Sequence, residues 1–162
     1  MPHSGTAESR SAARDARAGS RLRRATILII EPDDIAQEHY RSALKPLGCS
    51  FIQVTTGHAA LAVARRSIPD LVITELILPD LSGPEILSAF DADPSLCLAP
   101  IVAVSGAAAQ RQLTPAVAAE FADCILKPVD APRLRLVIQR ILEQDPEKWA
   151  PGARGETPLV RP

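Results

Sequence analysis

Five short apolar runs alternate with five segments of helical period along this chain of 162 residues, and few folds accept that order. The runs are almost continuously hydrophobic, which is typical of strands buried on both faces of a parallel sheet. Short links between strands and helices require right-handed crossovers, which place helices on both faces. We therefore predict an α/β, doubly wound fold with five strands. The predicted strands are Thr26–Ile30, Phe51–Thr55, Leu71–Glu75, Ile101–Ser105 and Cys124–Leu126, and the predicted helices lie near Asp34–Leu47, Gly57–Ser67, Gly83–Asp91, Thr114–Ala122 and Ala131–Gln144.

We expect an aliphatic core, because hydrophobic residues make up 46% of the chain and aromatic residues only 3%. So few rings argue against a stacking platform for single-stranded nucleic acid and against an aromatic-lined sugar site. The net charge of −1 argues against a globally basic nucleic-acid-binding domain. The cysteines Cys49, Cys97 and Cys124 predict neither a disulfide framework nor a zinc site. We expect free thiols in a reducing, cytoplasmic setting.

Charge divides the chain into three parts. Residues 1–25 contain six arginines against Glu8 and Asp15 and have little apolar mass, so we predict a disordered N-terminal arm. Residues 26–145 contain nine basic and 15 acidic side chains and form the predicted domain, and residues 146–162 are predicted to be a second disordered tail. The apolar run Ile27–Ile30 is too short for a signal peptide or a membrane span, so we expect no membrane association.

Polar side chains follow the predicted strands at their carboxyl ends, where doubly wound folds place their functional crevice. The first strand is followed by the acidic stretch 31–34, the third ends at Glu75, the fourth ends at Ser105, and Lys127 follows the fifth. Carboxylates are suitable ligands for Mg²⁺, and a hydroxyl and an ammonium group suit phosphoryl oxygens. Glycine-rich nucleotide-binding loops do not follow any of the predicted strands.

With these motifs, the chain resembles the receiver domain of two-component response regulators from about Thr26 to Gln144. The resemblance is carried by four segments in the order typical of that family, namely ILIIEPDD (27–34), PDLVITELILPDLSG (69–83), PIVAVSG (100–106) and CILKPV (124–129). It implies a CheY-like, flavodoxin-like fold with strand order 2-1-3-4-5 and five helices. It also implies a role in phosphorelay signal transduction in bacteria and a cis peptide bond between Lys127 and Pro128.

The resemblance assigns roles to four single positions. Glu75 occupies the phosphoacceptor slot, where the family has an aspartate. Ser105 and Lys127 match the hydroxyl and the lysine that contact the phosphate. Cys124 occupies the slot of the aromatic switch residue, so that ring is missing here.

The magnesium ligands of the family are incomplete in this chain. Their acidic pair falls on Glu31 and Pro32, and proline offers no side-chain ligand. We assign Asp33 to the acidic pocket together with Glu31, but it comes one residue late and is not assumed to reach the same point. We therefore expect weak or absent Mg²⁺ binding, no other metal and no other cofactor.

These departures predict a pseudo-receiver that signals without phosphorylation and is not an enzyme. Glutamate is longer than aspartate by about 1.5 Å, whereas in-line phosphoryl transfer tolerates misplacement on the order of 1 Å. The longer carboxylate can reach the place of the phosphate and accept hydrogen bonds from Ser105 and Lys127. The mimicry is partial, because a phosphate carries about −1.5 to −2 charges. Two simpler interpretations stay open, in which Lys127 only pairs with Glu75 or Glu31 and Ser105 only ends a strand.

Without phosphotransfer, function depends on protein surfaces. The resemblance implies contacts with a histidine kinase, a phosphotransfer protein or another regulator along the first helix. It also implies a signalling face made by the fourth helix, the fifth strand and the fifth helix. The mixed charges of that face suit a homodimer or a partner contact, and they come from Glu120, Asp123, Arg133, Arg135 and Arg140. We predict no second folded domain after Gln144, and hence a stand-alone receiver that acts as an adaptor or competitor.

Two other function classes stay open. A nucleic-acid-associated regulator would use the arginine arm, and its binding would weaken steeply with salt. A small α/β enzyme would use Glu75 and Lys127 in a reassigned site, although no nucleophile–base pair or cofactor loop accompanies them. Nucleic acid is not expected to be a partner.

Overall fold

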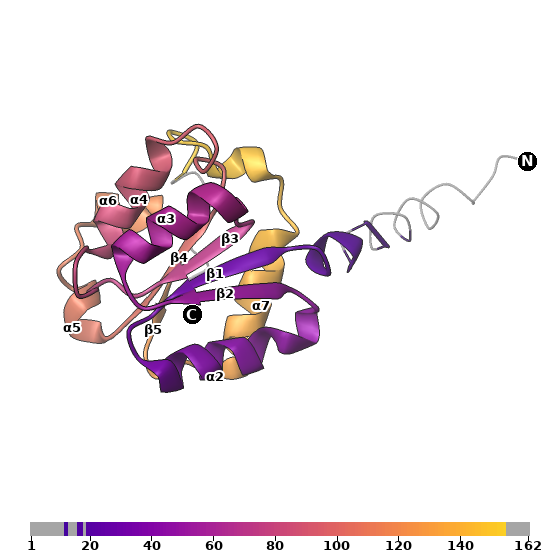
Figure 1. Cartoon of the computed structure of the whole chain (residues 1–162), viewed down its shortest axis with the longest axis horizontal. Coiled ribbons are helices and arrows are strands. Elements are labelled where there is room, and N and C mark those ends of the chain that lie inside the picture. Colours follow the sequence, from indigo (N-terminus) through magenta and orange to yellow (C-terminus); the bar gives the residue numbers. More distant parts are fainter. Residues whose placement is uncertain (1–11, 13–15, 18, 155–162) are drawn as a thin grey trace, which may run out of the picture.

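The predicted parallel sheet is confirmed, in the strand order that the resemblance implies (Figure 1). The computed structural model describes residues 12, 16–17 and 19–154. All paired strands run parallel in the order β2-β1-β3-β4-β5, which is the flavodoxin-like arrangement. The strands are β1 (Thr26–Ile30), β2 (Ser50–Val54), β3 (Leu71–Thr74), β4 (Ile101–Ser105) and β5 (Asp123–Leu126).

Helices cover both faces of the sheet (Figure 1). On one face α2 and α7 pack against each other, and α3, α4 and α6 lie on the opposite face. A short helix, α5, follows β4 and was not predicted, because its four residues are too few to show a period. The helices are α2 (Asp34–Leu44), α3 (Gly57–Ser67), α4 (Gly83–Asp91), α5 (Ala107–Gln110), α6 (Pro115–Glu120) and α7 (Ala131–Leu142), and two 3₁₀ turns are η1 (Lys45–Leu47) and η2 (Pro146–Trp149).

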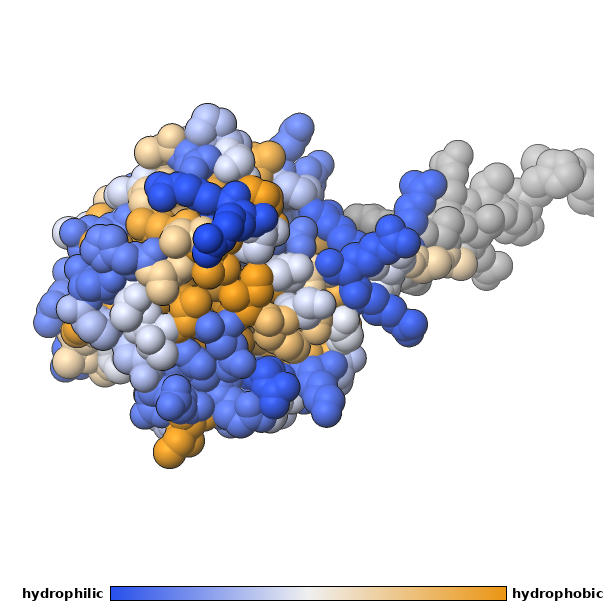
Figure 2. Space-filling view, in the orientation of Figure 1, coloured by the Kyte–Doolittle hydropathy of each residue, from blue (hydrophilic) through white to orange (hydrophobic). Residues whose placement is uncertain are grey.

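The sheet separates two hydrophobic clusters, which explains why its strands are apolar on both faces. Side chains alternate along a strand, so Ile27 and Ile29 pack toward α2 and α7, and Leu28 and Ile30 pack toward α3 and α4. Most of the core is aliphatic, as its composition predicts. Figure 2 shows one face of the molecule, where an apolar area near the β2 edge of the sheet is surrounded by hydrophilic residues.

The folded unit extends beyond the boundaries that we predicted at Thr26 and Asp145. Leu22, assigned to the N-terminal arm, is 8% exposed, and Trp149, assigned to the C-terminal tail, is 4% exposed. Both join the hydrophobic cluster beneath α2 and α7. The rest of the arm and the residues after Arg154 lie largely outside the described residues. Among the helices within the described ranges, none has both the length and the apolar character needed to cross a bilayer.

Candidate functional site

Four of the predicted site residues meet at the carboxyl end of the sheet. Glu31 follows β1, Glu75 follows β3, Ser105 ends β4 and Lys127 follows β5. Lys127 Nζ donates to Glu75 Oε2 at 2.6 Å and to Glu31 Oε2 at 2.9 Å. One lysine therefore bridges two carboxylates from neighbouring strands. The peptide bond between Lys127 and Pro128 is cis, which confirms the expectation from the resemblance.

Both carboxylate oxygens of Glu75 accept hydrogen bonds. Oε2 accepts from Lys127, and Oε1 accepts from the Leu76 backbone N–H at 2.7 Å and from the Ser105 hydroxyl. The side chain of Glu75 is only 12% exposed. The contacts that we expected from Glu75 to Ser105 and Lys127 are thus present. A carboxylate held in this way has little freedom to turn toward a reagent entering from solvent.

Glu31 is the most deeply buried acid of the cluster, with its side chain 4% exposed. Besides Lys127 it accepts hydrogen bonds from the Asp33 backbone N–H at 3.0 Å and, over a long 3.4 Å, from the Tyr40 hydroxyl. Burial raises the pKa of the Tyr40 phenol well above its usual value, so the hydroxyl stays a neutral donor. The side-chain amide of Gln37 donates to the Glu31 carbonyl at 2.7 Å.

Tyr40 and Gln37 are contributors that the sequence did not reveal. Both lie on α2, and the ring of Tyr40 packs in the core. Its hydroxyl nevertheless reaches Glu31, because a tyrosine ring can be buried while its tip finds a polar partner. The sequence does contain a signal for these contacts. Gln37 and Tyr40 lie in the first two turns of the helix that directly follows β1, which keeps them close to the end of that strand.

The Asp33 carboxylate does not take part in the hydrogen bonds that join Glu31, Glu75 and Lys127. Its Oδ1 accepts hydrogen bonds from the Ile35 and Ala36 backbone N–H groups at 2.8 and 3.0 Å. Asp33 is therefore the N-cap of α2, a position that aspartate favours because it satisfies free N–H groups of the first turn. Pro32, in the slot of the missing ligand, is exposed.

The ammonium of Lys127 remains charged in this setting. Its partial burial alone would lower the pKa of Lys127, but hydrogen bonds to Glu75 and Glu31 outweigh that effect and raise the pKa above its usual range. The two carboxylates and one ammonium leave the cluster with one excess negative charge. The ammonium of Lys127 lies between the carboxylates of Glu31 and Glu75, because it donates a hydrogen bond to each of them.

The side chains present do not fit a magnesium ion. The carboxylates of Glu31 and Glu75 both face Lys127, and the Asp33 carboxylate is turned to the start of α2. Octahedral Mg²⁺ needs free oxygen ligands in a fixed arrangement. Across the described part of the chain, no group of three or more His, Cys, Asp or Glu side chains is placed to hold a metal ion.

Cys124, in the slot of the aromatic switch residue, is a partly buried thiol on β5. Its Sγ lies 3.9 Å from the Ala118 carbonyl, across the gap to α6. Burial raises the pKa of the Cys124 thiol to about 11. At neutral pH the group is thus an uncharged packing residue, because reactivity requires the thiolate.

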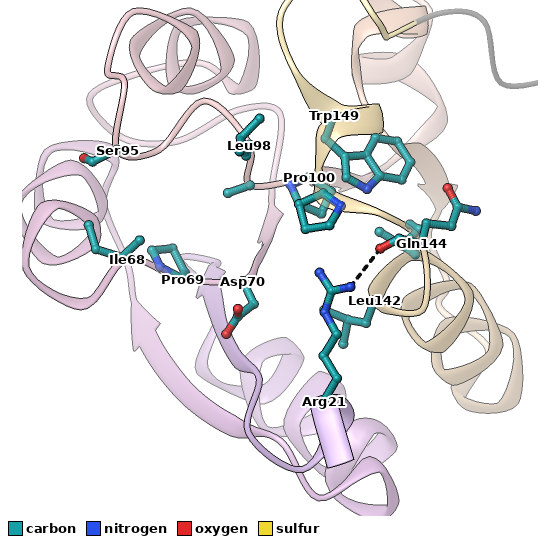
Figure 3. A pocket seen from close by; sticks show the side chains of 13 residues that line it. Arg21, Ile68, Pro69, Asp70, Ser95, Leu98, Pro100, Leu142, Gln144 and Trp149 are labelled. Carbon is teal, nitrogen blue, oxygen red and sulfur yellow. Dashed lines mark hydrogen bonds between the residues drawn. The ribbon is translucent and has the colours of Figure 1, made fainter. Parts of the chain in front are cut away.

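A separate cavity of about 220 Å³ lies at the opposite, amino-terminal end of the sheet (Figure 3). Arg21 borders it and donates from Nη1 to the Gln144 carbonyl at 3.2 Å. The wall is largely apolar, with Leu98, Pro100 and Trp149 among its residues. It is remote from the Glu75 cluster and shares none of its residues.

Comparison with known proteins agrees with the fold and the strand-end motifs. A family model described as "Response regulator receiver domain" matches residues 27–139. The regulatory protein LuxO of Vibrio vulnificus is 32% identical over 106 residues, which is 65% of this chain but only 23% of the LuxO sequence. The polar-differentiation response regulator DivK of Brucella abortus is 26% identical over 117 residues, covering 72% of this chain and 95% of DivK. A solved CheY-like receiver domain from Methylobacillus flagellatus superimposes with a TM-score of 0.66 at 30% identity, covering 73% of this chain and 98% of that one.

Proposed function

The chain belongs to the response regulator receiver family, and from that premise we propose that this receiver signals through protein contacts without being phosphorylated at Glu75. Receiver domains act in two-component signalling by binding protein partners. In this one, a side-chain carboxylate takes the place that a transient acyl phosphate takes in the family. Mg²⁺ binding is weak or absent, and the cluster has no catalytic role.

One observation carries this proposal. The carboxylate of Glu75 already accepts hydrogen bonds from Ser105 and Lys127, the two residues whose family counterparts contact the phosphate. Attack on a phosphoryl donor would require this carboxylate to leave both partners, and it would lack the metal ion that offsets charge on the phosphoryl oxygens. The same contacts resemble, with a smaller charge, those made to a bound phosphate.

The partner surface is proposed from the position of charged side chains. Arg140 of α7 pairs with Asp123 of β5 at 3.1 Å, which links two elements of the predicted signalling face. We propose that this face, together with α6, contacts a kinase, a phosphotransfer protein, another regulator or a second copy of the chain. We also propose a cytoplasmic location, where the thiols of Cys49, Cys97 and Cys124 stay free.

Incubation with acetyl phosphate and Mg²⁺, followed by intact-mass spectrometry, tests the proposal. We expect no gain of a phosphoryl group by the wild type. A matched double variant, Pro32→Asp with Glu75→Asp, restores the family's acid and metal-ligand pattern and is expected to gain the adduct. A stable acyl-phosphate adduct on Glu75 of the wild-type protein would refute phosphorylation-independent signalling.

A further inference from the structure

A basic helical segment precedes β1 and contributes no residue to the Glu75 cluster. Residues 16–17 and 19–22 are helical, and a turn at 23–24 leads into the strand. Arg17 and Arg21 lie four residues apart, which places them on one side of the helix, and Arg24 lies in the turn that follows it. All three are exposed. The described part of the segment therefore exposes three arginines, and one of them, Arg21, also donates a hydrogen bond to the body.

These arginines are held in a defined orientation on the body. Leu22 is buried in the core, and its carbonyl accepts a hydrogen bond from Cys49 Sγ at 3.2 Å. Arg21 reaches the Gln144 carbonyl after α7. In Figure 1 the segment leaves the body at the start of β1, and in Figure 2 its hydrophilic side chains stand clear of the body there. The three arginines thus lie at the opposite end of the sheet from Glu75.

The side chains of the segment indicate which class of ligand it binds. The first 25 residues contain six arginines and no lysine, and Arg10 and Arg14 continue the same spacing in the sequence. The planar guanidinium fork binds phosphate oxygens with two hydrogen bonds, which a lysine ammonium cannot do. A set of such groups therefore suits a polymer with regularly repeated phosphates.

Three other binding modes lack the residues that they need. Leu22 is the only large apolar residue between Met1 and β1, and it is already buried, so nothing is left to anchor the segment in a membrane interface. The first 25 residues contain no Phe, Tyr or Trp on which unpaired bases could stack. They also contain no Asn or Gln, the residues that read adenine edges in the major groove, so that mode of adenine recognition is excluded.

We propose that the exposed arginines Arg17, Arg21 and Arg24 bind the phosphate backbone of double-stranded nucleic acid. The body from residue 26 to 145 has 15 acidic against nine basic side chains, so it is repelled by the same polyanion. Nucleic acid is then held at one end of the molecule while the Glu75 end stays free for a protein partner. This proposal does not depend on the state of Glu75.

The test uses the full chain and a short fluorescein-labelled DNA duplex of mixed sequence, with binding measured by fluorescence anisotropy. We expect a dissociation constant on the order of 10⁻⁴ to 10⁻⁶ M. The affinity should fall steeply as the salt concentration rises from about 50 to about 200 mM. The triple variant Arg17→Ala, Arg21→Ala, Arg24→Ala should bind at least about tenfold more weakly, with a salt slope smaller by about 2 to 3. A control variant removes three exposed body arginines that lie outside the proposed partner face, Arg65→Ala, Arg66→Ala and Arg111→Ala, and should bind like the wild type.

Four results would overturn the proposal. Two concern the variants: the wild type shows no salt-dependent binding to the duplex, or the control variant loses as much affinity as the arginine variant. Two concern the ligand: the wild type binds single-stranded DNA of the same length, or phosphatidylserine vesicles, more tightly than the duplex. Far-UV circular dichroism of both triple variants shows whether they are folded, so a binding loss in a folded arginine variant is attributable to the three arginines.

Discussion

At the scale of single residues, the methylene that distinguishes Glu75 from an aspartate carries its carboxylate to both Ser105 and Lys127. Glu31 and Glu75 lie together with little access to water. Carboxylates are tolerated in such surroundings when a counter-charge and hydrogen-bond donors are close. The ammonium of Lys127 supplies both, so it is the group that allows the two acids to be buried side by side.

This dependence predicts the effect of removing the cation. Lys127→Met keeps most of the aliphatic stem but leaves two carboxylates without a counter-charge, and we expect it to lower the free energy of unfolding by about 3 kcal/mol. Adding Glu75→Gln should recover part of that loss, because one uncompensated charge is then removed. Urea unfolding followed by circular dichroism measures both. Lys45→Met, at an exposed lysine, is the control. Equal stabilities of Lys127→Met and of the double variant Lys127→Met with Glu75→Gln would contradict this account.

The meeting of Glu31, Glu75, Ser105 and Lys127 could be predicted from the sequence, because each follows or ends a strand and parallel strands end at one edge. Asp33 could not be placed in the same way. An aspartate after a strand and before a helix is equally suited to a metal site and to an N-cap, and only the backbone direction decides between them. In this chain the cap is formed, through the Ile35 and Ala36 N–H groups.

At the scale of elements, the strands were predicted to within a residue at each end, because burial on both faces makes an apolar run with sharp limits. The helices with a full apolar face were also predicted. The first of them, α2, ends at Leu44 instead of Leu47, because Pro46 lies in a 3₁₀ turn that follows it. The short helix α5 escaped prediction, since Ala107–Gln110 contains three alanines and one glutamine. A single turn of this composition has no apolar period to detect.

Asp80 links the loop after β3 to the start of α3, a contact that the sequence did not predict. Its carboxylate accepts hydrogen bonds from the Gly57 and His58 backbone N–H groups at 2.7 and 2.8 Å, and it lies 2.6 Å from His58 Nδ1. The hydrogen bond from the His58 backbone, helped by those from Gly57 and the His58 ring, holds the pKa of Asp80 well below its usual value. The loop that follows Glu75 is thereby tied to the start of α3.

The lowered pKa of Asp80 predicts how stability changes with pH. A group whose pKa is lower in the folded state stabilises the fold above its unfolded pKa of about 4 and loses that contribution as the pH falls through the folded value. Asp80→Asn should therefore be less stable than the wild type at neutral pH and should lose less stability below about pH 4. Thermal unfolding across this range measures the difference. Asp34→Asn, at an exposed acid, should follow the wild-type profile, and an unchanged acid profile in Asp80→Asn would exclude this role.

At the scale of the whole molecule, the segment after α7 returns across the amino-terminal end of the sheet. Arg154 pairs with Asp91 at the end of α4 at 2.5 Å and donates from Nη2 to the Cys97 carbonyl at 3.0 Å. Its Nε also donates to the Trp149 carbonyl. These contacts were not predicted, because isolated residues among prolines and glycines show no period. The same segment places Trp149 in the wall of the cavity beside Pro100 that Figure 3 shows.

Trp149 should therefore contribute to the stability of the whole domain. Its side chain is 4% exposed and packs in the same cluster as Leu22 and the residues of α7. Truncating a buried aromatic ring costs about 3 to 5 kcal/mol, and we expect Trp149→Ala to lower the free energy of unfolding by about 3 kcal/mol in urea titrations followed by circular dichroism. Lys148→Ala, at the exposed neighbour, should change it by less than about 0.5 kcal/mol. If both variants unfold at the wild-type midpoint, the segment after α7 does not stabilise the domain. The domain would then end near Asp145, as the sequence predicts.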